Sequence, residues 1–590
     1  MSENLSHLAG RKGIETNLFE KLGHAAAAQG SPDIEELESL RKEFLFGKAN
    51  VFGTASFYDF LKEENKGKKI YVCNGSACLT AGTQDEVKAK LLQHFKKEEI
   101  GEMCCLGRCH ENSAFHYQGK NYSGKALGGS GSGWISGIAG IASSGSGWIS
   151  GSEISGAAIS GTAISGTAIS GTVGLDSYAT GHIGHALLTG QQKKLESVRS
   201  QINEWLRRSP ETLTQELLTS NLRGRGGAGF PMALKLQACR QAPSSTGTKF
   251  IVCNADEGDP GAYSDRYLME HQPGLLLTGM IMAGYMAGAT YGVLYIRAEY
   301  PESIVQIEKT VKAFYSEGLA GKNLLNCGFS FDFKIIKAQG AYICGEETAL
   351  LSSIEGQRPE VRVRPPYPAQ SGLFNQPTVV NNVETLACVP VVLEKGGSAF
   401  SSIGKGKSSG TKLISLDGFF NRPGIYEADM GTPLERIINE LGQGFRLPVK
   451  ALHIGGPLGG LVPVSMISKL TLDFESFNEH GFLLGHASIV CLPQNFPVIR
   501  YLQHLFQFTS HESCGKCFPC RLGSKRGAEM LEKAISSNYK IDRQLLDDLL
   551  ETLESGSLCM LGGGLPLPVR NALMYFDEEL RSYFKPAAHA

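Results

Sequence analysis

Four cysteines near the carboxyl end of the 590-residue chain have the spacing of ligands to a metal cluster. Cys514, Cys517 and Cys520 form C-x2-C-x2-C, and Cys559 follows. Four thiolates in such an arrangement are typical of a [4Fe-4S] cluster, whereas zinc usually takes its ligands as separated pairs. The spacing therefore predicts a [4Fe-4S] cluster in this region.

A second group of cysteines lies near the amino end. Cys73 and Cys78 form C-x4-C, and in the run Cys104-Cys105-Leu-Gly-Arg-Cys109 the last cysteine closes either C-x3-C or C-x4-C. Four thiolates from two loops suit an iron–sulfur cluster or zinc, and the alternative for a lone pair is buried thiols. Because zinc sites favour tighter spacing, we expect a [2Fe-2S] cluster. The ungrouped cysteines are expected in the core.

A glycine-rich stretch at 221–230 has the composition of a phosphate-binding loop. Gly224, Gly226 and Gly229 spell G-x-G-x-x-G, and Gly227 adds a fourth glycine. Backbone without side chains can approach a phosphate closely and donate N–H groups to it. The residues before the stretch have helical periodicity, whereas the common dinucleotide fold needs a buried strand there. The stretch therefore predicts phosphate binding in a different fold.

Polar and acidic residues follow a predicted buried strand at 249–254. Asn254, Asp256, Glu257 and Asp259 come at its end, where polar groups are typical of ligand crevices in α/β sheets. A turn rich in Asn, Asp, Gly and Pro is the structural alternative. Further strands are predicted from residues 291 and 331, with helical stretches between them, which indicates an α/β domain.

Two adjacent carboxylates, Glu346 and Glu347, stand at a predicted helix start after the last of these strands. They could act as general acid and base, bind a metal, or interact with the helix dipole. Tyr367 follows on a proline-rich loop, and Asn381 and Asn382 form a polar pair farther on. Neither a Ser/His/Asp constellation nor a P-loop sequence occurs in the chain.

The composition excludes several classes of partner. The formal net charge is −1, from 57 basic and 58 acidic residues, which gives no overall field to attract nucleic acid or anionic lipid. No apolar run approaches the roughly 20 residues of a membrane span, and the amino end lacks a signal-peptide pattern. We therefore expect a cytoplasmic protein with no direct membrane insertion.

The length of the chain and the changes of pattern along it predict a multidomain α/β protein of six segments. They are a helical unit at 1–66, a cysteine-bearing domain at 67–125, a Gly/Ser/Ile-rich linker at 126–175, an α/β domain at 176–395, a small β-rich domain at 396–495 and a helical domain at 496–590. Within the linker, residues 126–172 contain Glu153 as their one charge, and Ile-Ser-Gly repeats with period five. A tether is favoured over a short solenoid.

Six motifs resemble, in order and spacing, those of the NADH-binding flavoprotein subunit of complex I. They are GRGGAGF at 224, NADEGDPG at 254, AYICGEET at 341, NNVET at 381, ESCGKCFPC at 512 and SLCMLGGGLP at 557. Upstream, VFGTASFY at 51, C-x4-C at 73 and CLGRC at 105 resemble the thioredoxin-like [2Fe-2S] subunit of the same enzyme, here fused ahead of it. Such fusions are typical of diaphorase subunits of soluble NAD-reducing hydrogenases and of NAD-linked formate dehydrogenases.

The resemblance implies FMN on the glycine loop and NAD(H) stacked over the flavin, with adenine near Tyr367 and ribose near Glu347. It also implies that Cys105, not Cys104, binds iron, and that the small β-rich domain is β-grasp-like. Asp259 stands where the family commonly has Glu, and Ala238 where an aromatic is common. The residues implied in cofactor binding are Gly224, Arg225, Gly226, Gly227, Ala228, Gly229, Phe230, Lys235, Asn254, Asp256, Glu257, Gly258, Asp259, Tyr342, Gly345, Glu346, Glu347, Arg364, Tyr367, Val380, Asn381, Asn382 and Thr385.

The implied activity is hydride transfer between NADH and FMN, followed by single-electron export through the [4Fe-4S] cluster to a partner subunit, with no side chain as catalytic acid or base. The [2Fe-2S] cluster would be a side store or second exit. The expected partner is a hydrogenase module. The alternatives are a formate dehydrogenase module, a complex I-type assembly, a non-catalytic iron–sulfur scaffold, and a diaphorase that acts alone on a small-molecule acceptor.

Overall fold

The computed structural model describes residues 14, 17–26, 30–128 and 178–586. The predicted linker lies, from residue 129 onward, outside these ranges. The first described part is the expected helical unit, made of α2 (Leu18–Ala26), α3 (Ile34–Phe44) and α4 (Lys48–Ala55). It packs on the α/β domain, and the hydroxyl of Tyr58 donates to Oγ of Ser353 at 2.7 Å.

The amino-terminal cysteines lie on a four-stranded sheet of order β2-β1-β3-β4. β1 pairs parallel with β2 and antiparallel with β3, and β3 pairs antiparallel with β4. The elements are β1 (Ile70–Cys73), α5 (Ser76–Ala81), α6 (Gln84–Leu91), β2 (Ile100–Met103), β3 (Ala114–Tyr117) and β4 (Lys120–Ser123).

A parallel sheet of order β8-β7-β6-β9 forms the centre of the α/β domain. Its strands are β6 (Phe250–Ala255), β7 (Tyr291–Arg297), β8 (Asp332–Ala338) and β9 (Thr378–Asn382). The chain adds β7 and β8 on one side of β6 and then returns to add β9 on the other side. Open α/β sheets bind ligands in a crevice at such a reversal of strand order, which here lies at the carboxyl ends of β6 and β9.

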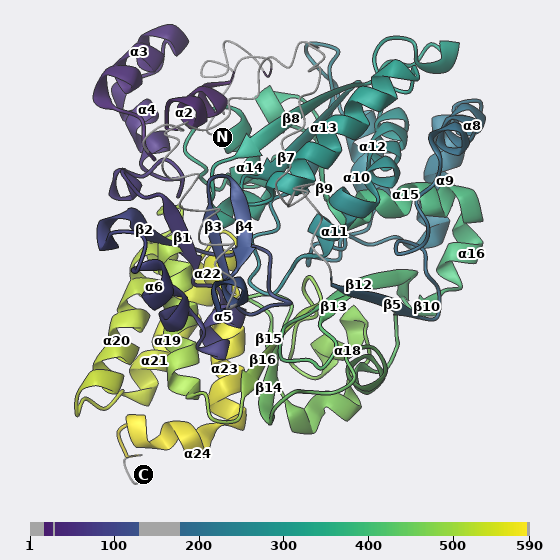
Figure 1. The fold of residues 1–590 in the computed structure, drawn as a ribbon. Helices are drawn as coiled ribbons and strands as arrows, with labels where there is room; N and C mark the ends of the chain where they lie inside the picture. Colours follow the sequence, from purple (N-terminus) through teal and green to yellow (C-terminus); the bar gives the residue numbers. More distant parts are fainter. Residues whose placement is uncertain (1–13, 15–16, 27–29, 129–177, 587–590) are drawn as a thin grey trace, which may run out of the picture.

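Eight helices accompany this sheet in the described part of the α/β domain (Figure 1). Parallel strands need such crossover connections, which cover the faces of the sheet. Helix α12 is apolar on all sides and is almost entirely buried. The helices are α8 (Leu195–Trp205), α9 (Pro210–Ser220), α10 (Met232–Gln241), α11 (Ser264–His271), α12 (Pro273–Ala287), α13 (Pro301–Ser316), α14 (Glu347–Ile354) and α15 (Val383–Lys395).

The small β-rich domain is a six-stranded sheet of order β15-β14-β16-β12-β13-β5. Its strands are β5 (Ala179–Ile183), β12 (Thr411–Leu416), β13 (Gly424–Asp429), β14 (Val449–Ile454), β15 (Gly460–Pro463) and β16 (Ser488–Pro493). The predicted boundary at 395/396 assigned β5 to the α/β domain, but its hydrogen bonds pair it with β13. Pairing between segments so distant in sequence leaves no local signal.

The last part is helical, as expected. Helix α19 is amphipathic and buries one face, and the first three cysteines of the carboxyl-terminal group lie between it and α20. The helices are α19 (Val498–Glu512), α20 (Ser524–Ser536), α21 (Arg543–Gly556), α22 (Met560–Gly563), α23 (Pro566–Tyr575) and α24 (Asp577–Leu580). Among the described residues, no helix has the length and apolar character needed to cross a membrane.

The amino-terminal cysteine domain is held between the other parts of the molecule (Figure 1). Nη1 of Arg266, on α11, donates to the carbonyl of Gly107, and the N–H of Gly418, after β12, donates to the carbonyl of Cys109. On another side, Oγ of Ser76 and Nε2 of His504, on α19, are 3.1 Å apart. The domain therefore contacts the α/β domain, the six-stranded sheet and the carboxyl-terminal helices.

Candidate flavin and iron–sulfur site

The glycine stretch is a closed loop between α9 and α10, so the expected helix before it is present. The N–H of Gly224 donates to the carbonyl of Phe230 at 2.8 Å. Gly227 and Gly229 have φ of 122° and 61°, where a side chain would be strained. A Cβ at Gly226 would lie 3.0 Å from Cβ of Asn382. Glycine is therefore favoured by conformation at 227 and 229 and by the close approach of Asn382 at 226, and the loop keeps its backbone accessible beside the crevice.

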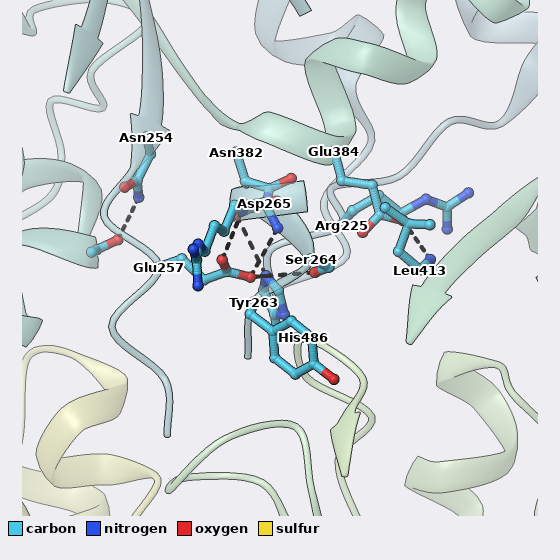
Figure 2. Close-up of polar contacts among 12 residues, drawn as sticks. Arg225, Asn254, Glu257, Tyr263, Ser264, Asp265, Asn382, Glu384, Leu413 and His486 are labelled. Carbon is cyan, nitrogen blue, oxygen red and sulfur yellow. Dashed lines mark hydrogen bonds and ion pairs between the residues drawn. The ribbon is translucent and has the colours of Figure 1, made fainter. Parts of the chain in front are cut away.

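Polar residues at the ends of β6 and β9 meet in the crevice, as the strand order requires. Asn254 pairs with Asn382 in register between these strands. Nδ2 of Asn254 donates to the carbonyl of Gly345 at 2.8 Å, which ties the crevice to the loop before α14 (Figure 2). Oγ1 of Thr385, in the first turn of α15, accepts from the N–H of Arg225 at 2.8 Å. Strand order thus brings four of the predicted motifs together.

Two buried polar atoms in this crevice have no hydrogen-bond partner within the described chain. They are Oδ2 of Asp256 and Nδ2 of Asn381. Buried polar groups are normally paired, so unpaired ones point to a missing ligand. Burial also raises the pKa of Asp256 well above its usual value. An acceptor and a donor beside an accessible glycine backbone fit the ribityl hydroxyls, ring and phosphate of FMN.

The two carboxylates at the start of α14 have different roles. Glu346 caps the helix, since its side chain accepts from the N–H groups of Thr348 and Ala349. Glu347 instead forms ion pairs of 3.1 Å with Lys235 and with Arg364. Glu346 therefore interacts with the helix dipole, which was one of the predicted alternatives, and Glu347 is available to a ligand between two cations.

The remaining predicted cofactor residues lie around this centre. The hydroxyl of Tyr342 donates to Oδ1 of Asp259 at 2.6 Å, and its ring packs against the backbone of Gly258. The carbonyl of Val380 accepts from Nζ of Lys235 at 3.1 Å. Phe230 and Tyr367 are exposed rings. Ala228 lies within the glycine loop.

A buried acidic pair with a histidine lies behind the crevice and was only partly predicted. Glu257 was expected there, but Asp265 and His486 were not. Nε2 of His486 lies 3.4 Å from Oε1 of Glu257 and 3.5 Å from Oδ2 of Asp265. The three residues come from the loop after β6, from α11 and from the segment before β16. No local motif marks His486, because both of its partners are more than 200 positions away.

The four expected amino-terminal ligands gather at one end of the four-stranded sheet. Cys73 ends β1, Cys78 lies in α5, and Cys105 and Cys109 follow β2 with their Sγ atoms 3.4 Å apart. All four are buried. Hydrogen bonds from Cys109 and Cys73 lower the pKa of Cys105 well below its usual value, and the charge of Arg297 lowers it further. This thiol is thus stabilised as a thiolate.

This cysteine group is joined directly to the flavin crevice. The N–H of Gly261, at the end of the loop that begins with Asn254, donates to Sγ of Cys109 at 3.3 Å. Arg297, at the end of β7, is buried between the same loop and the cysteines, and its Nη2 pairs with Glu299 at 2.7 Å. Arg297 had no signal in the sequence beyond its position at a strand end.

The carboxyl-terminal cysteines also converge. Burial raises the pKa of Cys520, with Cys514 and Cys517 close enough to add to the effect, and burial followed by neighbours that include Cys514 and Cys520 raises the pKa of Cys559 to about 12. The N–H of Leu558 donates to Sγ of Cys517 at 3.3 Å. Four convergent thiols with backbone donation fit a [4Fe-4S] cluster.

Comparison with known proteins supports the flavin crevice and the carboxyl-terminal iron–sulfur cluster. Residues 217–391 match the Nuo51 FMN-binding domain, and residues 500–583 match the NADH-ubiquinone oxidoreductase-F iron-sulfur binding region. A subunit of the NADH-quinone oxidoreductase of Rhizobium meliloti (strain 1021) is 37% identical over 407 residues, which cover 68% of this chain and 95% of the relative. The chain belongs to the NADH-quinone oxidoreductase flavoprotein family.

As a member of this flavoprotein family, the protein is an NADH-binding electron-transfer subunit with FMN and a [4Fe-4S] cluster. NADP-reducing hydrogenase subunit HndC of Solidesulfovibrio fructosivorans is 37% identical over 378 residues, or 64% of this chain and 76% of the relative. A chain of the air-oxidized NAD+-reducing [NiFe]-hydrogenase has a TM-score of 0.81 at 27% identity, covering 100% of this chain and 96% of that chain. The predicted family resemblance and the multidomain α/β fold are confirmed.

Proposed function

We propose that this flavoprotein is the diaphorase subunit of a complex similar to the NAD-reducing hydrogenases, in which it interconverts NADH and NAD and exchanges single electrons with partner subunits. The crevice at the ends of β6 and β9 carries this proposal. It combines an accessible glycine backbone with buried, unpaired polar atoms on Asp256 and Asn381. The whole-length similarity to a hydrogenase chain favours a hydrogenase partner over a complex I-type or formate dehydrogenase partner.

FMN, when bound, supplies the chemistry that takes up hydride and gives up electrons singly. The protein's contribution is binding and orientation. N–H groups of the glycine loop, fixed by Thr385 and Asn382, are placed to hold the phosphate. Asp256 and Asn381 are placed to bind ribityl or ring groups. In this assignment no side chain acts as a general acid or base on the substrate.

The nicotinamide cofactor is assigned to the exposed side of the same crevice. Tyr367 and Phe230 offer aromatic faces for the adenine and the stacked rings. Glu347 is placed to accept hydrogen bonds from ribose hydroxyls. Lys235 and Arg364 hold this carboxylate by ion pairs on either side. A 2′-phosphate would meet the carboxylate, so the wild type should prefer NAD to NADP.

The amino-terminal cysteines are assigned to a [2Fe-2S] cluster, and residues 67–125 to a thioredoxin-like domain. The order β2-β1-β3-β4 and the four buried thiols support this assignment. The tight zinc spacing C-x2-C is absent from this segment. The six-stranded sheet is assigned as β-grasp-like, with β5 as an additional strand.

The carboxyl-terminal cluster is assigned as the exit to the partner. Phe518 and Met560, each next to a cluster cysteine, have exposed fractions of 68% and 57%, and Leu522 and Leu558 are exposed beside them. Exposed apolar side chains gathered at one place are typical of an interface. We therefore expect the partner to be an iron–sulfur subunit that covers this apolar surface.

The flavin spectrum and NADH oxidation of the purified protein test the proposal. We expect a bound flavin that NADH bleaches anaerobically, and NADH-dependent reduction of a dye. A protein without flavin would instead be an iron–sulfur scaffold. If the native partner copurifies and hydrogen reduces the flavin in that complex, the hydrogenase assignment is supported; reduction by formate would overturn it.

A second test concerns the nicotinamide cofactor. The variant Glu347→Gln removes the negative charge but leaves Lys235 and Arg364 in place, so NADPH should gain at least about tenfold in kcat/KM relative to NADH. Glu475→Gln, which changes a surface carboxylate paired with Arg223, is the control. Equal use of both cofactors by the wild type would refute the role of Glu347.

A further inference from the structure

Glu257, Asp265 and His486 form a buried cluster of two carboxylates and one imidazole. Its two carboxylates lie around one imidazole nitrogen, and all three side chains are buried (Figure 2). Two carboxylates in one buried site repel each other, which favours protonation of one of them. The other charged groups that face His486 are Asp259 and Lys412, one of each sign.

A chain of hydrogen bonds leads from this cluster to the glycine loop. Oδ1 and Oδ2 of Asp265 accept from Nδ2 of Asn382 at 3.0 and 2.8 Å. Oδ1 of Asn382 accepts from the hydroxyl of Thr385 at 2.9 Å. The same Thr385 hydroxyl oxygen accepts from the N–H of Arg225 at 2.8 Å. Each link has one direction of donation. An ionised Asp265 can only accept, so its charge fixes the orientation of the Asn382 amide.

The backbone next to His486 also lies close to the glycine loop. His486 follows Gly485, whose φ is 54° and whose backbone lies 3.8 Å from the Cβ position of Gly227. Glu257, the second anion, accepts from the N–H groups of Asp265 and Arg266 at 3.0 Å each and thereby holds the start of α11. The histidine is therefore in contact with both anions and adjoins the loop that their hydrogen bonds position.

We propose that His486 is a positioning residue of the flavin site, whose imidazolium pairs with the Asp265 carboxylate and so holds Asn382, Thr385 and the Arg225 N–H in the arrangement that binds FMN. This inference rests on the proposed flavin function. The pKa values agree with it. Burial alone would lower the pKa of His486, but its hydrogen bond to Asp265 and the two negative charges raise it to about 9. Burial raises the pKa of Glu257 to about 7, with repulsion from Asp265 adding to the effect.

The test is FMN binding to the FMN-depleted full-length protein at several pH values, measured by quenching of flavin fluorescence. In His486→Asn, affinity should fall about tenfold near pH 8, which corresponds to about one pKa unit of lost charge stabilisation. Affinity should return as the pH falls, because Glu257, whose pKa rises further once the charge of His486 is lost, then takes up a proton and the repulsion is relieved. The wild type should retain FMN until the pH rises through about 9, where His486 loses its proton.

A double variant separates charge from packing. Glu257→Gln combined with His486→Asn removes one anion together with the cation, so binding near pH 8 should recover relative to His486→Asn alone. His182→Asn, at an exposed histidine on β5, is the control and should bind FMN as the wild type does.

Three outcomes would overturn the inference. The first is unchanged affinity in His486→Asn. The second is an equal loss at every pH without recovery in the double variant, which would indicate packing alone. The third is a stoichiometric divalent metal that His486→Asn loses. A wild type that binds no FMN would instead refute the proposed function, so the two failures are distinguishable.

Discussion

The two cysteine groups of this protein have similar chemistry but opposite surroundings. The four expected ligands of the amino-terminal group are buried, and an N–H from the flavin crevice donates to one of their sulfurs. In the carboxyl-terminal group Cys517 and Cys559 are only half-buried, and exposed apolar residues flank both. Only a centre near the surface can approach a centre on another protein. The comparison therefore supports the proposal that the carboxyl-terminal group is the exit for electrons and the amino-terminal group an internal store.

Removing a ligand of the exit should have the largest effect. In Cys517→Ser, electron delivery to the partner should fall by more than about 100-fold, which exceeds the usual loss from changing groups that merely support a ligand. FMN should remain bound, and a dye that meets the flavin directly should still be reduced. Parallel assays with partner and dye, with iron analysis, measure this. Equal loss of both activities with flavin retained would contradict the exit role.

The exposed surface around the exit should matter next. Phe518→Ala removes an exposed ring beside Cys517 and should weaken partner binding about five- to tenfold, as loss of an interface anchor does. Dye reduction and iron content should not change. Met574→Ala, equally exposed at the far end of α23, is the matched control. A pull-down with the native partner gives the comparison, and equal effects of both variants would exclude this surface.

The buried group should be less important for turnover. Cys78→Ser should lower the partner-linked and the dye-linked rates only about threefold, because the proposed main route of electrons does not pass through this cluster. Its paramagnetic signal should disappear, whereas Cys104→Ser should keep the signal. A collapse of partner-linked activity in Cys78→Ser would make the buried cluster the main route and reverse the comparison.

Much of the fold could be predicted from local patterns. β6 and β7 are continuous apolar runs, and they lie within about a residue of the expected positions. β9 was predicted only as a polar pair, because two of its five residues are asparagines. β5 was assigned to the wrong neighbours, because its pairing with β13 spans more than 240 positions.

Residues of the site that meet from distant segments could likewise not be predicted from local patterns. Motifs identified the glycine loop, Asn254 and Asn382, because each carries its own spacing. They could not identify Asp265 or His486, whose roles arise only when the loop after β6, α11 and the segment before β16 meet. Nor could they show that Glu347 lies between two cations.

The smallest effect is expected in the segment that connects the cysteine-bearing domain at 67–125 to the α/β domain. Replacing residues 126–172, which we predict to be a tether, by a Gly/Ser linker of equal length should change neither activity by more than about twofold, because loop closure entropy changes slowly with length and the length is kept. Iron content, flavin content and both rates test this. Loss of a cluster or of flavin would favour the solenoid alternative.

The hydrogen bond from the Gly261 N–H to Sγ of Cys109 limits how chimeras of this protein and its relatives could be built. The R. meliloti relative is matched over 95% of its length by only 68% of this chain. A chimera that joined the first 128 residues to such a relative would replace the loop at 254–261, and with it the donor to Cys109. Exchange at the domain boundary would therefore place the amino-terminal cysteines of this protein against the crevice residues of the relative. A successful graft must carry this loop, and the residues that meet it, along with the cysteines.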